Sequence, residues 1–164
     1  MIFVTVGTQL AFDRMVRVID EWADRAAIAD GSAPEVFAQI GPSEFVPKHI
    51  EHKAFIEPTE FAERARAAEA IVAHAGMGSI LTALSYGKPI VIMPRRADLG
   101  EQRNDHQLST AARFKGRPGV FVANDETELP AILDSLKDLR AAEPIPPFAS
   151  PSLIKAIRDF IDAV

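Results

Sequence analysis

Short runs of apolar residues recur along the chain, and longer stretches with helical spacing separate them. Six such runs are rich in Val, Ile, Phe and Ala: Ile2–Val6, Val36–Ile40, Ala54–Ile56, Ala70–Ala73, Pro89–Met93 and Val120–Val122. Continuous apolar runs of this length are typical of strands that are buried on both faces of a parallel sheet. We therefore predict a strand at each run.

The segments between these runs carry apolar residues every three or four positions, as amphipathic helices do. The predicted helices span Phe12–Ala26, Thr59–Ala65, Ile80 to the stop at Gly87–Pro89, Leu108–Phe114, Leu129–Leu139 and Ser150–Ile161. Thr59 and Thr127 are predicted N-terminal caps. Strands that alternate with helices predict an α/β fold with a doubly wound, Rossmann-like parallel sheet. With 164 residues and no internal repeat, residues 1–164 are expected to form a single domain.

The unusual polar and glycine-rich segments follow directly after predicted strands. They are Gly7–Gln9, Gly41–Ser43, Glu57, His74–Ser79 and Arg95–Gln107. Ligands of open α/β sheets bind beyond the carboxyl ends of the strands. Loops are polar in general, but the concentration of Gly, His, Arg and Asn at these ends favours a binding edge.

The segment HAGMGS, His74–Ser79, lies between a predicted strand and a predicted helix. The first turn of a helix exposes unpaired N–H groups at the positive end of the helix dipole. Gly76 and Gly78 have no Cβ, so a diphosphate can approach the backbone closely. The alternative is a tight turn without a ligand, because the segment has neither GxGxxG spacing nor a Walker lysine. Ser79 does not lie in the GxSxG motif of a hydrolase nucleophile.

A second polar segment, Pro94–Gln107, follows the fifth predicted strand. Its amide, carboxylate and imidazole side chains suit the hydroxyl groups of a sugar. Arg95, Arg96 and Arg103 could pair with a carboxylate, which favours a glucuronate ligand. The alternatives are contacts with an anionic membrane surface or a lipid diphosphate, or a solvated loop of mixed charge.

Composition narrows the possible functions. The net charge is −5, which gives no general attraction to nucleic acid, and there is no cysteine for disulfides, thiolate catalysis or zinc. His49 and His52 form an HxxH pair without further evident ligands, so we predict surface histidines and no metal site. The apolar N-terminus has no preceding basic segment and predicts a strand rather than a signal peptide. No apolar stretch is long enough to span a bilayer.

Taken together, FVTVGTQ, HAGMGS, ALSYGKPIVIMPR and NDHQ resemble glycosyltransferase family 28. The resemblance covers nearly the whole chain and extends to the donor-binding C-terminal half of GT-B enzymes. Free-standing subunits of this kind include the bacterial exopolysaccharide PssE type, reported as part of a glucuronosyltransferase. They also include the cytosolic subunit of the eukaryotic dolichol-linked N-acetylglucosaminyltransferase. The MPRRADLGEQRNDHQ segment is more similar to the bacterial group.

The resemblance implies particular roles for matching residues. The UDP and diphosphate positions are Gly7, Thr8, Phe55, Ile56, His74, Gly76, Gly78 and Ser79, with the backbone of Phe55 and Ile56 at the uracil edge. The donor-sugar positions are His106 and Gln107, with Asn104, Asp105 and Arg95 beside them. Thr82 falls where the family often has a ribose-binding glutamate, so ribose recognition is expected to be weaker, shifted or supplied elsewhere. No catalytic residue is assigned.

The resemblance also implies a partner, since a complete GT-B enzyme has a second, acceptor-binding half that usually carries the general base. We expect a membrane-anchored subunit of the PssD type and sugar transfer from a UDP-sugar to a polyprenyl-diphosphate-linked saccharide in exopolysaccharide biosynthesis. No cofactor is implied. The location implied is cytoplasmic, at the inner face of the membrane through the partner. Leu153, Ile157, Phe160 and Ile161 of the last helix could contribute to the interface, although core packing is the stronger expectation for most of them.

Three functions remain open from the sequence. The first is a donor-binding catalytic subunit of a glycosyltransferase. The second is a regulatory module that binds a nucleotide sugar without turnover. The third, a lone hydrolase or epimerase acting on a UDP-sugar, is the weakest, because one Rossmann-like half leaves the sugar open to solvent.

Overall fold

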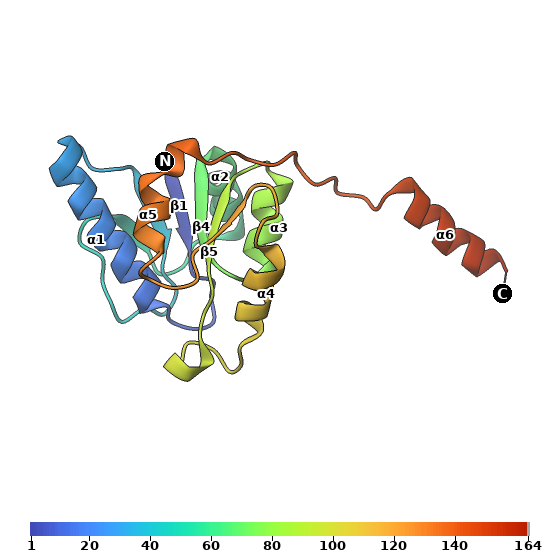
Figure 1. Ribbon diagram of the computed structural model, residues 1–164, viewed down its shortest axis with the longest axis horizontal. Coiled ribbons are helices and arrows are strands. Elements are labelled where there is room, and N and C mark those ends of the chain that lie inside the picture. Colours follow the sequence, from blue (N-terminus) through green and yellow to red (C-terminus); the bar gives the residue numbers. More distant parts are fainter. Residues whose placement is uncertain (164) are drawn as a thin grey trace.

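The computed structural model describes residues 1–163, with the exception of the Asp30 side chain, and contains one parallel six-stranded sheet (Figure 1). The strands are β1 (Ile2–Thr5), β2 (Val36–Gln39), β3 (Glu51–Lys53), β4 (Ala70–His74), β5 (Ile90–Met93) and β6 (Val120–Val122). Their order is β3-β2-β1-β4-β5-β6, and all neighbours are parallel. The chain winds outward from β1 to β3 and then from β4 to β6. This is the doubly wound Rossmann-like arrangement, which confirms the predicted fold class.

Six α-helices connect or follow the strands in the described part of the chain. They are α1 (Asp13–Asp30), α2 (Pro58–Ala67), α3 (Met77–Ser85), α4 (His106–Phe114), α5 (Leu129–Asp134) and α6 (Pro151–Asp162). Two short 3₁₀ turns, η1 (Ala97–Leu99) and η2 (Leu136–Asp138), follow β5 and α5. The predicted caps Thr59 and Thr127 are wrong, since α2 starts at Pro58 and the Thr127 hydroxyl instead bonds Asp125 at 2.6 Å.

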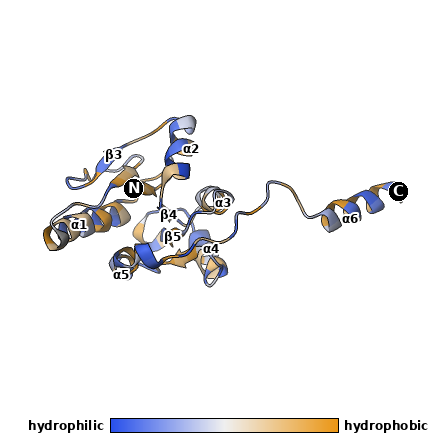
Figure 2. Cartoon of the chain, turned by 90° about the horizontal axis from the view of Figure 1, so that it is seen from above, coloured by the Kyte–Doolittle hydropathy of each residue, from blue (hydrophilic) through white to orange (hydrophobic). Residues whose placement is uncertain are grey.

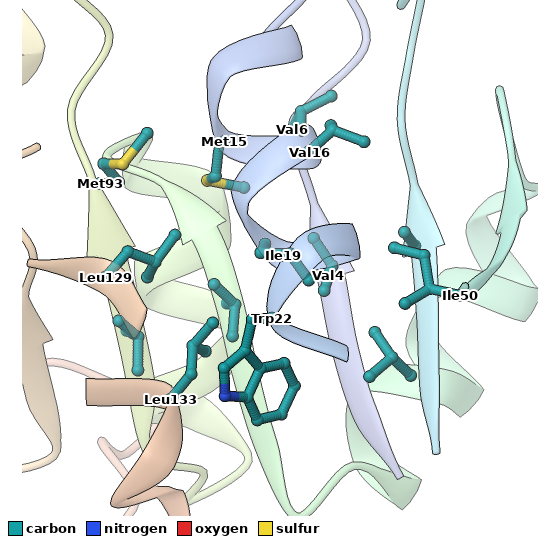
Figure 3. Close-up of a cluster of buried hydrophobic side chains, with 14 of the residues drawn as sticks. Val4, Val6, Met15, Val16, Ile19, Trp22, Ile50, Met93, Leu129 and Leu133 are labelled. Atoms are coloured by element: carbon teal, nitrogen blue, oxygen red, sulfur yellow. The ribbon is translucent and has the colours of Figure 1, made fainter. Parts of the chain in front are cut away.

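Helices cover both faces of the sheet, as successive strand side chains point to opposite sides. One face packs against α1 and α5 through a cluster that includes Val4, Met15, Trp22 and Leu133 (Figure 3). The indole N–H of Trp22 donates to Asp134 at 2.8 Å, which ties α1 to α5. The opposite face packs against α2, α3 and α4 through a second cluster. The two cores fix the strand ends and therefore the loops that leave them.

The third strand is displaced from its predicted place. It spans Glu51–Lys53 rather than Ala54–Ile56. The side chains of this edge strand are exposed or half-buried, unlike those of the apolar edge strand β6, so its charged sequence EHK gives no apolar run. Ala54–Ile56 forms the loop that follows, and its backbone is anchored by a hydrogen bond from Gly41 N to Ala54 O at 2.8 Å.

The C-terminal segment leaves the sheet at its amino-terminal edge. Ile145 N donates to Leu84 O at 3.1 Å, and Pro144 lies against Gly87, just before β5. Beyond this anchor, α6 stands apart from the sheet and its helices in both views (Figures 1 and 2). It begins as predicted, with the Ser150 hydroxyl capping Leu153 N at 3.3 Å.

No residue of α6 is buried among those described. Its apolar side chains are 52% (Leu153), 51% (Ile157), 72% (Phe160) and 63% (Ile161) exposed. The expectation of core packing for these residues is therefore wrong. Within the described residues, no helix has both the length and the apolar character needed to cross a membrane.

Candidate functional site

A pocket of about 290 Å³ opens at the carboxyl ends of β1, β4 and β5. Three loops form its walls, and the lining residues are Val6, Gly7, Thr8, Gln9, Leu10, His74, Gly76, Arg95, Gln102, His106 and Gln107. The sequence predicted ligand binding at this edge. The structure brings together Gly7, Thr8, His74 and Gly76 with His106 and Gln107, although some 100 residues of chain separate the first from the last.

His74 forms the floor of this pocket between two glycines. A Cβ on Gly7 would lie 3.0 Å from Cε1 of His74, and a Cβ on Gly76 would collide with Nε2. Nδ1 lies 3.5 Å from the Thr5 carbonyl oxygen, so it carries the proton of a neutral ring. Burial, together with the nearby Arg95 cation, lowers the pKa of His74 to about 4. The ring is therefore neutral at pH 7, and Nε2 is an acceptor.

The N-terminus of α3 lies beside His74. Gly76 is its cap residue, and no side chain caps the helix, so the N–H groups of Met77, Gly78 and Ser79 have no intrahelical acceptor. Apart from its chain neighbours and the backbone of its own helix, no heavy atom lies within 4 Å of where a Gly78 Cβ would be. Open space above backbone donors is the geometry that an anionic group requires. Gly78 and Ser79 are not among the pocket-lining residues but belong to this first turn.

Arg95 is buried and its guanidinium points into the protein. It donates to the carbonyl oxygens of Val6 and Leu10, at 2.7 Å each, and to that of Ala11. Burial lowers the pKa of Arg95 to about 10, so it remains a cation at neutral pH. The expected contact with a sugar carboxylate does not fit this geometry, because the donors are used on the loop after β1. Arg95 instead holds that loop in place.

Gln107 and His106 stand at the start of α4 and face the pocket. Gln107 is 3% exposed, and its Oε1 accepts from Arg95 N at 3.1 Å. This fixes the amide orientation and leaves Nε2, which makes no hydrogen bond to the described residues, as a donor. The His106 ring binds Asn104 Oδ1 through Nδ1, which leaves its Nε2 as an acceptor.

The other predicted sugar residues, Asn104 and Asp105, do not line the pocket. Asn104 Oδ1 accepts from the His106 backbone N–H at 3.2 Å, and Asp105 Oδ1 accepts from Ala97 N at 3.0 Å. Both side chains therefore shape the loop that carries His106 and Gln107.

Phe55, Ile56 and Thr82 lie outside the pocket lining. Phe55 is exposed, whereas Ile56 packs against the second core cluster. Thr82 follows Gly78 by one turn on α3, so the two share a helix face. These positions would extend the site along the sheet edge, and their predicted contacts with uracil and ribose remain predictions.

The sequence interpretation missed Gln39, a buried residue at the end of β2. Its Oε1 accepts from the Thr5 hydroxyl at 2.6 Å, and its Nε2 donates to Gly7 O at 3.0 Å and Ala54 O at 3.4 Å. Gln39 thus joins the glycine loop after β1 to the loop that carries Phe55. An amide in an otherwise apolar strand is the signal that could have identified it.

A larger hollow, about 590 Å³, lies along the edge strand β6 and the segment after η2. None of the predicted site residues lines it. Among the described residues, no group of three or more His, Asp or Glu side chains could hold a metal ion. His49 pairs with Asp24 at 3.3 Å, and the His52 ring faces the Ile50 carbonyl oxygen.

Comparison with known proteins agrees with this architecture. The human UDP-N-acetylglucosamine transferase subunit ALG13 is 29% identical over 125 residues, which cover 73% of this chain. The match spans only 11% of that human protein. The solution structure of ALG13 aligns with a TM-score of 0.61 at 19% identity, over 94% of this chain and 93% of that one.

The crystal structure of the glycotransferase of kitacinnamycin aligns with a TM-score of 0.57 at 18% identity. That alignment covers 96% of this chain and 37% of the larger protein. At such identities the two structures support the shared fold alone. A direct family match extends over residues 1–141, which include every strand and every residue of the pocket. The chain therefore belongs to the family of the glycosyltransferase family 28 C-terminal domain.

Proposed function

We propose that this chain is the donor-binding catalytic subunit of a UDP-sugar glycosyltransferase. The observation that carries the proposal is the pocket at the carboxyl sheet edge, between the Gly7 loop and the uncapped N-terminus of α3. Family membership supports sugar transfer, and similarity to a human UDP-N-acetylglucosamine transferase subunit supports a UDP-sugar donor.

In this proposal, the diphosphate of the donor binds the first turn of α3. Backbone N–H groups of Met77, Gly78 and Ser79 stabilise its charge, and neutral His74 forms the floor. As the sugar bond breaks, negative charge grows on the departing UDP. Fixed donors at a helix N-terminus stabilise that charge without the cost of reorganising solvent.

The sugar extends toward the start of α4, where Nε2 of Gln107 donates to its hydroxyl groups and Nε2 of His106 accepts from them. Gln107→Ala should therefore reduce turnover of the assembled enzyme by about tenfold or more while UDP affinity stays nearly intact. Loss of UDP binding with normal turnover at saturating donor would reject this role.

A partner is proposed to supply the acceptor half. The partner is also proposed to carry the general base, since no carboxylate lines the pocket in the described structure and the two lining histidines are proposed to serve the diphosphate and the sugar. Exposed apolar side chains also surround the carboxyl edge of the sheet: Leu10, Phe55, Met77, Leu81, Leu99 and Leu108. Such a rim, together with the unpartnered α6, is typical of a protein interface.

The proposed partner is a membrane-anchored subunit of the PssD type, and the acceptor is a polyprenyl-diphosphate-linked saccharide in exopolysaccharide biosynthesis. The complex would act at the inner face of the cytoplasmic membrane. Purified alone with UDP-sugar and lipid-linked acceptor, the chain should be inactive, and adding the partner should restore transfer. Transfer by the lone chain would contradict the two-subunit proposal.

The identity of the sugar is a separate proposal. Of the three arginines that suggested glucuronate, Arg95 binds backbone carbonyls and Arg96 pairs with Asp98 at 2.6 Å. Arg103 makes no ion pair with the described residues, so the glucuronate proposal now rests on it. Arg103→Gln should lower the preference for UDP-glucuronate over UDP-glucose, and an unchanged preference would count against glucuronate.

Calorimetric titration with UDP tests the site itself. Gly78→Val places a side chain in the open space above the first turn of α3 and should weaken UDP binding at least tenfold, about 1.4 kcal/mol. Ser85→Val, on the exposed C-terminal turn of the same helix, is the matched control and should bind normally. Unchanged affinity in a folded Gly78→Val protein would overturn the site. Binding without transfer, even with the partner, would favour the regulatory module.

A further inference from the structure

Arg14, on the second position of α1, forms a set of ion pairs that no sequence motif indicated. Its Nε and Nη2 donate to the two carboxylate oxygens of Glu101, both at 2.8 Å. Nη2 also donates to Pro94 O at 3.2 Å, and Nη1 to Glu126 at 2.6 Å. The side chains of Arg14 and Glu101 are only 13% and 11% exposed, so water screens their interaction weakly.

Glu101 in turn organises the loop between β5 and α4. Its Oε2 accepts from Arg96 N at 2.9 Å, and its backbone carbonyl accepts from Arg95 Nη1 at 3.3 Å. These bonds close residues 94–101 into a compact turn around the Arg14 guanidinium. The loop then runs directly into His106 and Gln107.

Arg95 provides a second connection, in the opposite direction. It reaches from this loop to the carbonyl oxygens of Val6, Leu10 and Ala11, which flank Gly7 and Thr8. Arg14 belongs to the helix that follows the same Gly7 loop. The two arginines therefore fasten the loop after β1 and the loop after β5 to each other, and both loops line the pocket.

We propose that Arg14, through Glu101, is a positioning residue for the donor sugar. It sets the position of His106 and Gln107 relative to the diphosphate end of the pocket without touching the donor. The bidentate geometry matters, because the two parallel hydrogen bonds of a guanidinium fix both the distance and the orientation of the Glu101 carboxylate. An ammonium group would supply only a positive charge. The identity of the ligand in this inference rests on the proposed function, whereas the geometry of the loop does not depend on it.

The first experiment separates sugar positioning from nucleotide binding. Arg14→Met keeps the length of the side chain but removes every donor. We expect the affinity for UDP to change by less than about twofold and kcat/KM for the UDP-sugar, measured with the partner, to fall about tenfold, or 1.4 kcal/mol. Arg17→Met is the matched control on α1, since Arg17 lies over the Phe45 ring, 4.3 Å from its centroid, and should change neither quantity.

Conservative variants distinguish positioning from a general loss of stability. Arg14→Lys keeps the charge without the fork and should recover only part of kcat/KM. Glu101→Gln should lower kcat/KM to a similar degree, and combining it with Arg14→Met should add little, because both act through one contact. Fully additive losses, or an equal loss of UDP affinity, would overturn the proposal.

The second experiment needs no ligand. Amide hydrogen exchange in the partner-free, full-length chain should rise at residues 96–105 in Arg14→Met and stay unchanged in the sheet. Normal exchange in this loop contradicts the positioning role. If the wild-type chain fails to bind UDP but exchange still rises in Arg14→Met, the loop geometry is supported and the proposed function is contradicted. A failure of the positioning role is therefore distinguishable from a failure of the proposed function.

Discussion

The imidazole of His74 packs on Gly76 so closely that a Cβ at position 76 would collide with Nε2. A Cβ at Gly7 would lie 3.0 Å from Cε1 of the same ring, and Gly7 has a φ of +80° that L side chains rarely adopt. The two glycines and the histidine thus form one packed unit, which brings the loops after β1 and β4 into contact. The glycines of HAGMGS therefore have different physical reasons to be glycine.

This difference predicts opposite behaviour at Gly76 and Gly78. Gly76→Ala forces the His74 ring to move and should lower the free energy of unfolding by about 1–3 kcal/mol, as overpacking does. Gly78→Ala meets open space and sits in a helix, so stability should be unchanged or slightly higher. Urea unfolding of both variants measures the contrast. Equal destabilisation would contradict the packing described.

The depressed pKa of His74 predicts an acid-dependent loss of stability. Its pKa is about 4 in the folded protein against 6.5 ordinarily, so between these values the unfolded chain binds the proton first. The free energy of unfolding is therefore unaffected by His74 protonation above about pH 6.5 and decreases as the pH falls toward 4. The decrease is on the order of 1 kcal/mol for each unit by which the pKa is lowered.

Comparison with a variant isolates this effect from other titrating groups. His74→Asn can still donate to the Thr5 carbonyl oxygen but does not titrate. Its urea midpoint should fall less than that of the wild type between pH 7 and pH 4.5. Parallel curves for the two proteins would show that His74 does not cause the loss.

Gln39 is predicted to matter for both stability and the site. Gln39→Leu is nearly isosteric. The Thr5 oxygen keeps its bond from Gly7 N, but the hydroxyl proton of Thr5, which is 1% exposed, loses its acceptor and the Gly7 carbonyl oxygen loses its donor. Such unpaired buried groups cost about 1–3 kcal/mol. UDP affinity should also fall, because the Gly7 loop loses its anchor on β2. Adding Thr5→Val should recover part of the stability, and a further full loss would indicate that the two side chains are not coupled.

Removal of residues 148–164 should leave the fold intact. The described residues of α6 contribute no buried side chain, so Tm should stay within about 2 °C of the full chain. Ile145→Asp is the contrasting variant, because Ile145 packs against the second core cluster and bonds Leu84. It should lower Tm by about 4–8 °C, as a loss of about 2 kcal/mol does in a domain of this size. A large drop on truncation would show that α6 packs on the sheet in solution.

Sequence patterns identified five of the six described strands, including the edge strand β6, and failed at β3, whose side chains are exposed or half-buried. Val36–Gln39 and Ile90–Met93 are apolar because helices cover both their sides. Glu51–Lys53 has one open edge and charged side chains, so its pairing with β2 leaves no hydrophobic signature. The apolar stripe of α6 led to the wrong expectation of core packing. Amphipathic spacing shows that one face of a helix is suited to burial, but it does not show what buries that face.

At the site, the sequence located the loops but not the direction of each side chain. HAGMGS was recognisable because glycines and a helix start leave a local pattern. Arg95 and Arg14 make their contacts with residues 84 and 87 positions away, and nothing in the local sequence records those partners. The same holds for Gln39, whose role depends on pairing between β1 and β2. Long-range polar contacts of this kind become visible only once the sheet order is known.

The C-terminal segment leaves the sheet at its amino-terminal edge, so a partner bound to α6 and a partner bound at the pocket would be attached to opposite edges of the sheet. The segment that leads to α6 is anchored beside Leu84 and Gly87. The pocket lies at the other end of the strands, about 16 Å away for the five residues of β4. A protein bound to α6 alone would stay tethered at an effective concentration in the millimolar range while the pocket stands open. UDP could then leave and a new donor could enter without dissociation of the complex, so successive turnovers would not depend on re-encounter in solution.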